Sequence, residues 1–362
     1  MKRRHFLQAA GLGLATTALA KPAIAQSNPA INWRLTMSAP KSLDSVYGAC
    51  EVFGKRVAEI TDNQFQIQVF AAGEIVPALA VLDAVQAGTV EMGNTSAYYY
   101  WGKDPALAFG SGVPFGLNTR QMESWLRHGG GNELLQDVFA SFNCCGIPMG
   151  NTGCQMGGWF RKEINKVDDL RGLKFRIGGF AGKIISKLGV VPQQIAAGDI
   201  YPSLEKGTID AVEWIGPYDD EKLGFQKIAR YYYYPAWWEG SSNLHTLVNL
   251  AKWNGLPKPY QAALLAAARD AGHWMTGKYD AGNPPALKRL LAGGTQLRPF
   301  SQEIMEASYR AANEVCAETS ADNPRFKKIY DSMVAFRGDS YLWWQVAEMS
   351  FDSFQVRMRA RT

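Results

Sequence analysis

Apolar and polar residues near the start of the chain alternate first with the period of a strand and then with that of a helix. The segments "INWRLTMSA" and "FQIQVF" alternate with a period of two, and each predicts a strand with one buried face. The intervening "YGACEVFGKRVAEIT" and the following "VPALAVLDAVQAG" place apolar residues at helical spacing, and "TVEMG" predicts another strand. Strand, helix and strand in this order predict parallel, right-handed α/β units.

The second half of the chain repeats this order. "LKFRIGG" and "TIDAVEW" predict strands, "VVPQQI" an extended segment, and "FAGKIISKLG" and "DIYPSLEKG" helices. We expect Asp199 to cap the helix of "DIYPSLEKG" and Pro202 to lie in its first turn, where proline costs little. The corner "AVQAGTVEMGN", residues 84–94, is echoed by "SLEKGTIDAVEW", residues 203–214. The echo predicts equivalent helix-to-strand corners in two similar lobes.

The remaining segments are mostly helical. "NTRQMESWLRHGGGNELLQDVFASF" predicts two helices broken at residues 129–131, and an aromatic stretch begins later at "YYYYPAWWEG". The last segment, "YLWWQVAEMSFDSFQVRMRA", predicts one helix whose large apolar surface is formed by Leu342, Trp343, Val346, Met349, Phe354 and Met358. Such a helix packs either against its own body or against a partner subunit, and the sequence leaves both open.

The first 25 residues have the composition of an export signal. Arg3 and Arg4 are followed by an apolar stretch at residues 7–20 and by a small-x-small cleavage site at residues 23–25. The start "KRRHFLQ" resembles a twin-arginine (Tat) signal. An N-terminal membrane anchor is the alternative, but this apolar run is short for crossing a bilayer, which takes about 20 residues.

Removing this leader changes the charge of the chain. The formal net charge falls from +5 to about +1, because the leader contains four basic residues and no acid: Lys2, Arg3, Arg4 and Lys21. A nearly neutral mature chain argues against a nucleic-acid surface. About 337 residues remain, enough for two domains, and no later segment approaches a membrane span, so we expect a soluble mature protein.

Catalytic signatures are missing from the chain. "GGFAGKI" fails as a phosphate loop, since Ile177 occupies the first glycine position and Ile184 follows Lys183. No G-x-S-x-G elbow occurs, and three widely separated histidines support neither a zinc triad nor a Ser-His-Asp arrangement: His128, His245 and His273. The chain has five cysteines without C-x-x-C spacing, and we expect most of them to be buried small side chains: Cys50, Cys144, Cys145, Cys154 and Cys316. We therefore expect a cleft that binds and does not catalyse.

Two strands of the second lobe carry charged residues where such a cleft would lie. Arg176 stands in the apolar strand "LKFRIGG", where a guanidinium needs an anion. The anion is either a ligand carboxylate or an internal acid such as Asp168 or Asp169. Glu213 and Trp214 end "IDAVEW" at the carboxyl end of a strand, where ligands bind in open α/β sheets. Glu213 is either a ligand for a cation or hydroxyl, or an exposed acid.

Other candidates are weaker by themselves. Gln155 in "NTGCQMGG" is flanked by glycines that let a backbone approach closely. Asn94 ends the first echo, and three tyrosines follow it: Tyr98, Tyr99 and Tyr100. Trp237, Trp238 and Glu239 lie near the return to the first lobe. Aromatic strings of this kind are either cleft walls or core.

Three segments of the chain resemble one family. "AAGEIVPALAVLDAVQAGTVEMGN", "VDDLRGLKFRIGG" and "DIYPSLEKGTIDAVEW" resemble blocks of the DctP-type solute-binding proteins of TRAP transporters, which are tripartite ATP-independent periplasmic uptake systems. The similarity spans about residues 33–345, and the family's selectivity-filter arginine stands where Arg176 stands. The first block departs from the family, which often has "G.LG" where this chain reads "GEIV".

The resemblance implies a fold. It implies an α/β, type II-like periplasmic binding protein of two lobes, with mixed sheets flanked by helices, a cleft between the lobes and a long C-terminal helix. We place lobe I at residues 32–149 plus about 241–285 and lobe II at 150–240 plus about 286–335. Residues 336–362 form the C-terminal helix, which in this subgroup can swap between subunits of a homodimer; docking within one chain is the alternative.

The resemblance also implies a ligand, a cation and a membrane partner. The chain is most similar to members that bind 2-oxo or 2-hydroxy monocarboxylates, such as pyruvate, and deliver them to a membrane permease. A bridging Na⁺ or Ca²⁺ is implied at Gln155, Glu213, Glu239 and the Trp214 backbone carbonyl, with no organic cofactor. The implied substrate-binding residues are Arg176, Gln155, Tyr99, Tyr100, Trp214 and Asn94. The alternatives are another carboxylate, a sugar acid or polyol, or a Tat-exported enzyme.

Overall fold

Five strands form the first of two mixed β-sheets. In this computed structural model, which describes residues 29–359, β1 pairs in parallel with β2 and β3, while β10 pairs antiparallel with β3 and β4. The strand order is β2 (Phe65–Phe70), β1 (Ile31–Met37), β3 (Met92–Thr95), β10 (Asn243–Asn249) and β4 (Cys144–Asn151). A strand from late in the sequence therefore lies in the middle of a sheet built from early ones. The predicted export signal, residues 1–25, lies outside the described residues.

Six short strands form the second sheet. Their order is β11 (Gln296–Pro299), β9 (Tyr231–Tyr234), β5 (Gly158–Phe160), β8 (Ala211–Val212), β6 (Lys174–Arg176) and β7 (Val191–Gln193). β6 pairs in parallel with β7 and β8, and β5 runs antiparallel to its neighbours β8 and β9. The parallel pairing of β6 and β8 is important for function, because it brings the carboxyl ends of both strands to the same edge.

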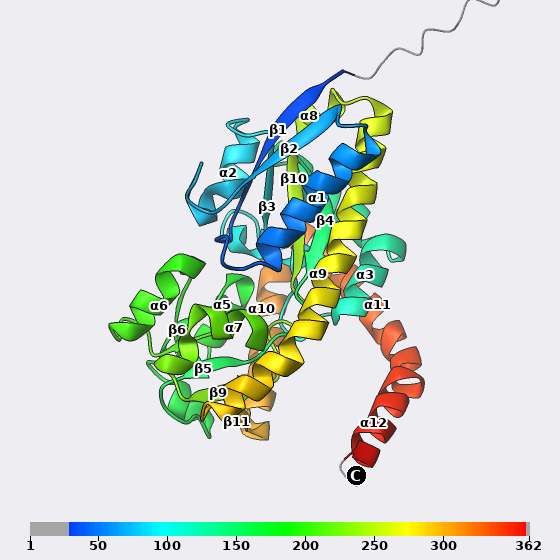
Figure 1. Cartoon of the computed structure of the whole chain (residues 1–362). Helices are drawn as coiled ribbons and strands as arrows, with labels where there is room; N and C mark the ends of the chain where they lie inside the picture. Colours follow the sequence, from blue (N-terminus) through cyan, green and yellow to red (C-terminus); the bar gives the residue numbers. More distant parts are fainter. Residues whose placement is uncertain (1–28, 360–362) are drawn as a thin grey trace, which may run out of the picture. The chain divides into compact units, whose positions relative to one another are not determined.

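Helices cover both sheets and give the α/β, two-lobed architecture that the sequence predicts (Figure 1). α9 (Lys258–Ala292) packs against α1 (Val46–Ile60) and β4 in the first lobe and against α7 (Pro217–Leu223) in the second. Shorter helices complete the lobes: α2 (Val81–Gln86), α3 (Thr119–His128), α4 (Gly131–Ala140), α5 (Gly179–Ser186), α6 (Ala197–Glu205) and α8 (Leu250–Asn254). Five 3₁₀ turns accompany them: Ala78–Ala80, Ala97–Tyr100, Pro105–Gly110, Val167–Leu170 and Phe225–Lys227.

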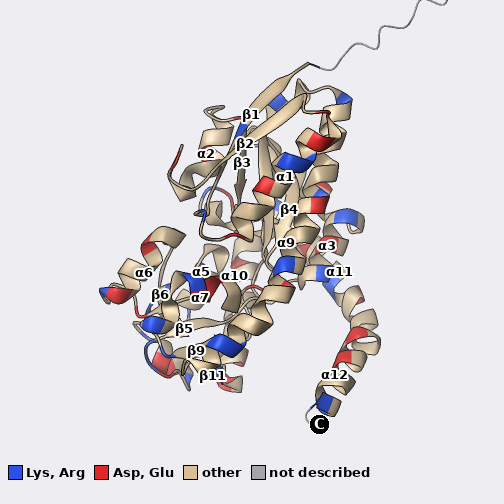
Figure 2. Ribbon diagram, in the orientation of Figure 1, with Lys and Arg blue, Asp and Glu red and all other residues tan. Residues whose placement is uncertain are grey.

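The strand and helix order expected for both halves is present, and the lobe boundaries stay a prediction. Basic and acidic residues are interspersed along the ribbon in the view of Figure 2. Among the described helices, none combines the length and the apolar composition that crossing a bilayer would take.

One helix start differs from the expectation. α6 begins at Ala197 after Ala196, so Asp199 lies inside the first turn and Pro202 lies in the second turn. The reason is that the Asp199 amide already donates to the Ala196 carbonyl at 3.0 Å, which closes a turn before Asp199 is reached. The predicted cap is therefore wrong, although a carboxylate in the first turn still suits the helix dipole.

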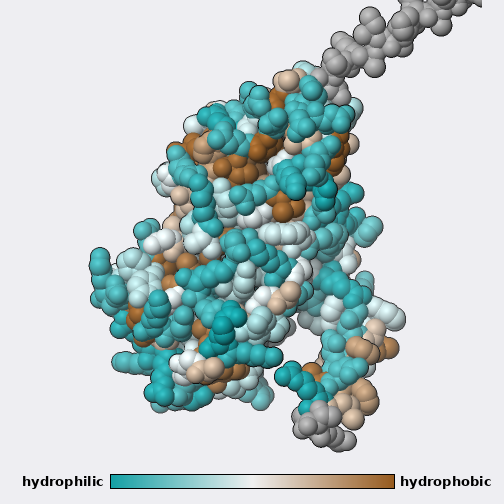
Figure 3. Space-filling model, viewed as in Figure 1, coloured by the Kyte–Doolittle hydropathy of each residue, from teal (hydrophilic) through white to brown (hydrophobic). Residues whose placement is uncertain are grey.

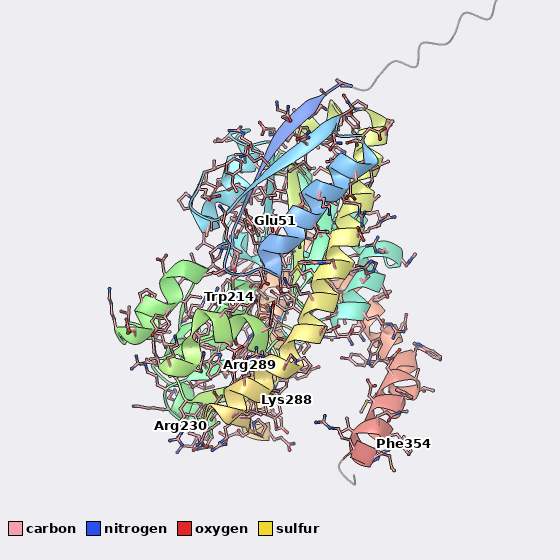
Figure 4. The ribbon with its side chains drawn as sticks, viewed as in Figure 1. Glu51, Trp214, Arg230, Lys288, Arg289 and Phe354 are labelled. Carbon is pink, nitrogen blue, oxygen red and sulfur yellow. The ribbon has the colours of Figure 1, made fainter. Side chains whose placement is uncertain are left out.

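The C-terminal segment also differs from the single packed helix that was expected. α11 (Pro324–Val346) follows α10 (Gln302–Asp322), and a break at Ala347 separates it from α12 (Glu348–Arg359). All six predicted apolar residues of this segment are exposed, with Leu342 and Val346 each 66 % exposed. Apolar residues are visible on α12 in Figure 3, and Phe354 projects from it in Figure 4. Packing of this face against its own body, one of the two alternatives, is thus not what the chain does.

Candidate functional site

A cavity lies between the two lobes and is lined from both sides. Asn94, Tyr98 and Tyr99 come from the first lobe, where β3 passes into the following 3₁₀ turn. Gln155 and Trp214 come from the second lobe, from the loop after β4 and from the end of β8. Trp214 lies midway between the lobes in Figure 4. The two echoed corners of the sequence thus face one another across this cavity.

Arg176 and Glu213 form a buried ion pair next to this cavity. Arg176 ends β6 and Glu213 directly follows β8, so the parallel pairing of these strands puts them side by side. The Arg176 Nη1 donates to Glu213 Oε1 at 2.5 Å and to the Glu213 carbonyl at 2.7 Å. The side chains are 1 % and 0 % exposed, so each charge depends on the other.

The internal acid that partners Arg176 is therefore Glu213, and the alternatives Asp168 and Asp169 are wrong. Asp168 pairs with Arg171 on the surface, and Asp169 accepts from the backbone amides of its own turn. The sequence could not separate these acids, because Glu213 is 37 positions away and meets Arg176 only through strand pairing. Arg176 still has free capacity: Nε donates to the Ile195 carbonyl at 3.1 Å, and within residues 29–359 Nη2 has no hydrogen-bond partner.

Three side-chain oxygens around this pair are buried and lack hydrogen-bond partners within the described chain: Gln155 Oε1, Glu213 Oε2 and Glu239 Oε2. The Gln155 amide nitrogen donates to Thr152 Oγ1 at 3.0 Å, which turns the amide oxygen the other way. The Gln155 backbone N–H donates to the Glu239 carbonyl at 3.2 Å, so these two residues are neighbours. Buried polar atoms without partners are rare in folded proteins; the described chain holds others elsewhere, but these three oxygens belong to residues grouped around Arg176.

The electrostatics of this cluster are unbalanced. Burial raises the pKa of Glu213, against the lowering effects of Arg176 and of the Gly178 N–H. Burial and the neighbouring Glu213 raise the pKa of Glu239 well above its usual range. With one guanidinium facing two buried carboxyl groups, the second group favours its protonated form, and a bound cation would let both ionise.

The donor set fits a hard cation. Two carboxylates and a carboxamide supply oxygen atoms only, the ligand type preferred by Na⁺-like and Ca²⁺-like ions. Within residues 29–359, no group of three or more His, Cys, Asp or Glu residues is arranged to hold a metal. The set would therefore need its amide oxygen, and also a backbone carbonyl or the ligand itself, to complete a coordination shell.

The tyrosines divide into two roles. Tyr98 and Tyr99 line the cavity, but Tyr100 does not: its hydroxyl accepts from the Leu82 amide at 3.2 Å and contacts Thr95 Oγ1 at 3.3 Å. A 3₁₀ turn has three residues per turn, so successive side chains point about 120° apart and cannot all face one cavity. Asn94 lines the cavity and donates to Thr246 Oγ1 at 3.2 Å.

Several lining residues carried no sequence signal of function. Ser38, Thr152 and Ser242 are small hydroxyl residues in loops, and only the folded chain brings them to the cavity. Gly178 and Gly179 were visible in "RIGG" but were not singled out as part of the site. An added Cβ at Gly178 would lie 2.7 Å from Tyr98 Cε2, so the two glycines make room for the Tyr98 ring.

The sequence pattern of the family described as bacterial extracellular solute-binding protein, family 7 (DctP) matches residues 36–323. The chain belongs to this family. The monocarboxylate 2-oxoacid-binding periplasmic protein of Nostoc sp. (strain PCC 7120) is 51 % identical over 360 residues, covering 98 % of this chain and 99 % of that protein.

Two solved structures of TRAP transporter solute-binding proteins are also similar. One, from Bordetella bronchiseptica RB50, is a dimer with copurified calcium and picolinate in one site (49 % identity, TM-score 0.91, covering 92 % of this chain and 99 % of that one). The other, from Pseudoalteromonas atlantica T6c, holds sodium and pyruvate (36 % identity, TM-score 0.87, covering 89 % and 98 %). This DctP-family protein is thus a TRAP transporter solute-binding protein, of a family that binds small organic acids and works with a membrane permease.

Proposed function

We propose that this protein captures a small 2-oxo monocarboxylate such as pyruvate, together with one Na⁺ or Ca²⁺, and delivers it to the membrane permease. The observation that carries the proposal is the cluster of three buried, unpartnered oxygens beside Arg176. The names of the Nostoc relative and of the two solved structures support the ligand class and the two ions.

In this proposal Arg176 receives the ligand carboxylate. Its Nη1 and Nε are occupied by Glu213 and Ile195, which hold the guanidinium plane fixed and leave Nη2 for the ligand. The ring of Trp214 lies against the guanidinium, with 4.9 Å from Cζ to the ring centroid, and excludes water from that side. Tyr98, Tyr99 and Asn94 close the other wall of the cavity.

Gln155, Glu213, Glu239 and the Trp214 carbonyl would hold the cation. When bound, the cation supplies a positive charge that attracts a carboxylate oxygen and the 2-oxo oxygen of the ligand. Glu213 pairs with Arg176 through Oε1, and its unpartnered Oε2 would be free to help hold the cation. A ligand of so few atoms cannot bind tightly by apolar contact area, so charge must supply most of the affinity.

Thermal unfolding with added ligands tests this function. Pyruvate should raise the Tm of the mature protein only when Na⁺ or Ca²⁺ is present, because ligands that prefer the native state stabilise it. Arg176→Ala should abolish the pyruvate shift, and Glu213→Gln should abolish the response of the Tm to the cation. Stabilisation by a sugar acid or a polyol, with none by pyruvate, would show that the substrate belongs to that other class. A pyruvate shift unaffected by chelation of cations would reject the ion site.

The exposed apolar residues at the end of α11 and on α12 support a second, separate proposal, that two copies of the chain associate through their C-terminal helices. Trp343, Met349, Phe351 and Val356 are each 58–69 % exposed, a large apolar surface for a single chain. The Bordetella relative is a dimer. Light scattering should give twice the chain mass for the mature protein and one chain mass after removal of residues 347–362. A monomeric full-length protein would contradict the proposal.

We also propose export by the Tat route. The pair Arg3–Arg4 carries this proposal. Changing both to lysine should trap the precursor in the cytoplasm, whereas unchanged export would show a different route.

A further inference from the structure

A buried carboxylate in α7, that of Asp220, accepts a hydrogen bond from the peptide group that borders the cavity. The Ile215 N–H donates to Asp220 Oδ1 at 3.2 Å, and Asp220 is 0 % exposed. The same peptide group carries the Trp214 carbonyl. Within residues 29–359, no group donates a hydrogen bond to that carbonyl oxygen. One end of the peptide is thus held, and the other end is available.

The geometry of the peptide unit links its two ends. A trans peptide is planar, and its C=O and N–H point in opposite directions. The one cis bond among the described residues is Tyr234–Pro235, so the Trp214–Ile215 peptide is trans. Because its N–H points toward Asp220 in α7, its carbonyl points away from that helix. Turning the carbonyl elsewhere would break the bond to Asp220.

Asp220 is itself held firmly. Its Oδ2 accepts from Trp159 Nε1 at 3.0 Å and from the Tyr232 hydroxyl at 2.7 Å. The Trp159 and Tyr232 rings stack with centroids 4.0 Å apart, so both donors are fixed by packing. A carboxylate that accepts from the N–H end of a peptide polarises the peptide and increases the negative charge on its carbonyl oxygen.

We propose that Asp220 is a positioning residue for the cation: it orients and polarises the Trp214–Ile215 peptide so that the Trp214 carbonyl is presented as a ligand. This inference rests on the proposed function, since it assumes the cation held by Gln155, Glu213 and Glu239. Groups that hydrogen-bond to metal ligands typically change metal affinity by 10–100-fold when removed. In our proposal Asp220 has the same effect, but the metal ligand that it orients is a backbone carbonyl, that of Trp214.

The adjacent acid offers a matched control. Asp219 is also 0 % exposed, but its Oδ2 accepts from the Tyr279 hydroxyl at 2.6 Å and it makes no hydrogen bond to the 214–215 peptide. Tyr232→Phe is a second control, because it removes one donor to Asp220 and leaves the bond from Ile215 intact. Both substitutions disturb the same buried region without releasing the carbonyl.

Calorimetric titration of the mature protein with Ca²⁺, at saturating pyruvate, tests the inference. Asp220→Asn should weaken Ca²⁺ binding about tenfold or more, while Asp219→Asn and Tyr232→Phe should stay within about twofold of the wild type. Equal losses in Asp219→Asn and Asp220→Asn would reduce Asp220 to a structural role and overturn the inference, as would wild-type affinity in Asp220→Asn.

A measurement on the wild-type protein covers the case in which Asp220→Asn does not fold. Ligation of the Trp214 carbonyl should shift the ¹⁵N resonance of Ile215, the other atom of that peptide, when Ca²⁺ is added. An unmoved Ile215 resonance at saturating Ca²⁺ would overturn the inference while pyruvate and Ca²⁺ still bind. Failure of pyruvate to bind at all would instead reject the proposed function.

Discussion

In the proposed function, the Arg176–Glu213 pair contributes to ligand recognition as well as to stability. Neither charge reaches solvent, and removing one partner of a buried pair typically costs 3–5 kcal/mol, because the other charge is left uncompensated. Arg176→Ala therefore tests binding and folding together. A substitution that keeps the positive charge separates the two effects.

Arg176→Lys is that substitution. Lysine keeps a charge opposite Glu213 but has one nitrogen, so it cannot also bond the Glu213 and Ile195 carbonyls and a ligand carboxylate. We expect the variant to fold and to bind pyruvate at least about tenfold more weakly, a loss of about 1.4 kcal/mol. Calorimetry and the Tm of the ligand-free protein check the two halves of this prediction. Unchanged pyruvate affinity would show that the fork geometry is not used.

The buried carboxyl group of Asp219 makes the free energy of unfolding depend on pH. Burial raises the pKa of Asp219 to about 7, despite the hydrogen bond from Tyr279, whereas an unfolded aspartate titrates near about 3.9. The native state thus favours the protonated form. Its contribution to stability is complete below about pH 4 and is lost as the pH rises through 7.

Asp219→Asn removes this titration. The free energy of unfolding of the ligand-free wild type should fall between pH 5 and pH 8 by more than that of Asp219→Asn, and urea unfolding at several pH values measures both. Subtracting the two profiles cancels the other titrating groups that the proteins share. Parallel profiles would contradict the prediction.

At the scale of elements, the glycine pair between β6 and α5 faces the 3₁₀ turn that carries Tyr98. The Tyr98 ring from the first lobe lies against Gly178 and Gly179 from the second. Gly178 has φ −85° and ψ 152°, an extended conformation that alanine adopts without strain. Its lack of a side chain is thus needed for the approach of the lobes and not for its own backbone.

Gly178→Ala should consequently hinder the close approach of the two lobes at the cavity and leave the lobes themselves intact. An added Cβ would come 2.7 Å from Tyr98 Cε2, and overpacking of this kind costs about 1–3 kcal/mol. We expect pyruvate to bind about 5–150-fold more weakly, with the Tm of the ligand-free protein nearly unchanged. Gly198→Ala in α6, where a Cβ would meet nothing within 4 Å, is the control. Equal affinities for both variants would show that this contact does not limit closure.

At the scale of the whole molecule, the lobes are joined by a charged cluster at Asp44 as well as by the site. Asp44, just before α1, pairs with Lys222 of α7 and with Lys278 of α9, and accepts from the Tyr218 hydroxyl at 3.1 Å. Burial opposes the charge of Asp44, but its lysine partners and Tyr218 lower its pKa to about 2, so it is ionised at neutral pH. Lys222 and Tyr218 belong to the second lobe and Lys278 to the first, so the contacts with Lys222 and Tyr218 hold the two lobes against each other.

Asp44→Asn should weaken the contact between the two lobes slightly. Because ion pairs this exposed contribute about 1 kcal/mol or less, we expect pyruvate affinity to fall by no more than about fivefold. Glu74→Gln is a matched control, since it breaks the similarly exposed pair with Lys41 inside the first lobe. Calorimetry on both variants decides the outcome. A larger loss in Glu74→Gln than in Asp44→Asn would argue against a role for Asp44 in closure.

The sequence by itself determined the features that repeat along the chain. Alternation in "FQIQVF", helical spacing around α1 and the echoed corners depend on neighbours within a few positions, so they predicted the α/β order and the two lobes. Arg176 stood out because a charge in an apolar strand requires a partner. The resemblance to the DctP family added the ligand class and the cation residues, which composition and spacing did not supply.

Tertiary structure alone decided which groups meet. Arg176 meets Glu213 through β6–β8 pairing, Tyr98 meets Gly178 across the cavity, and Asp220 of α7 turns back to the Trp214–Ile215 peptide in the preceding loop. The folded chain also turns the Tyr100 side chain away from the cavity, toward Leu82 and Thr95. Each of these contacts joins groups whose direction in space depends on how whole elements pack, and local periodicity carries no information about that direction.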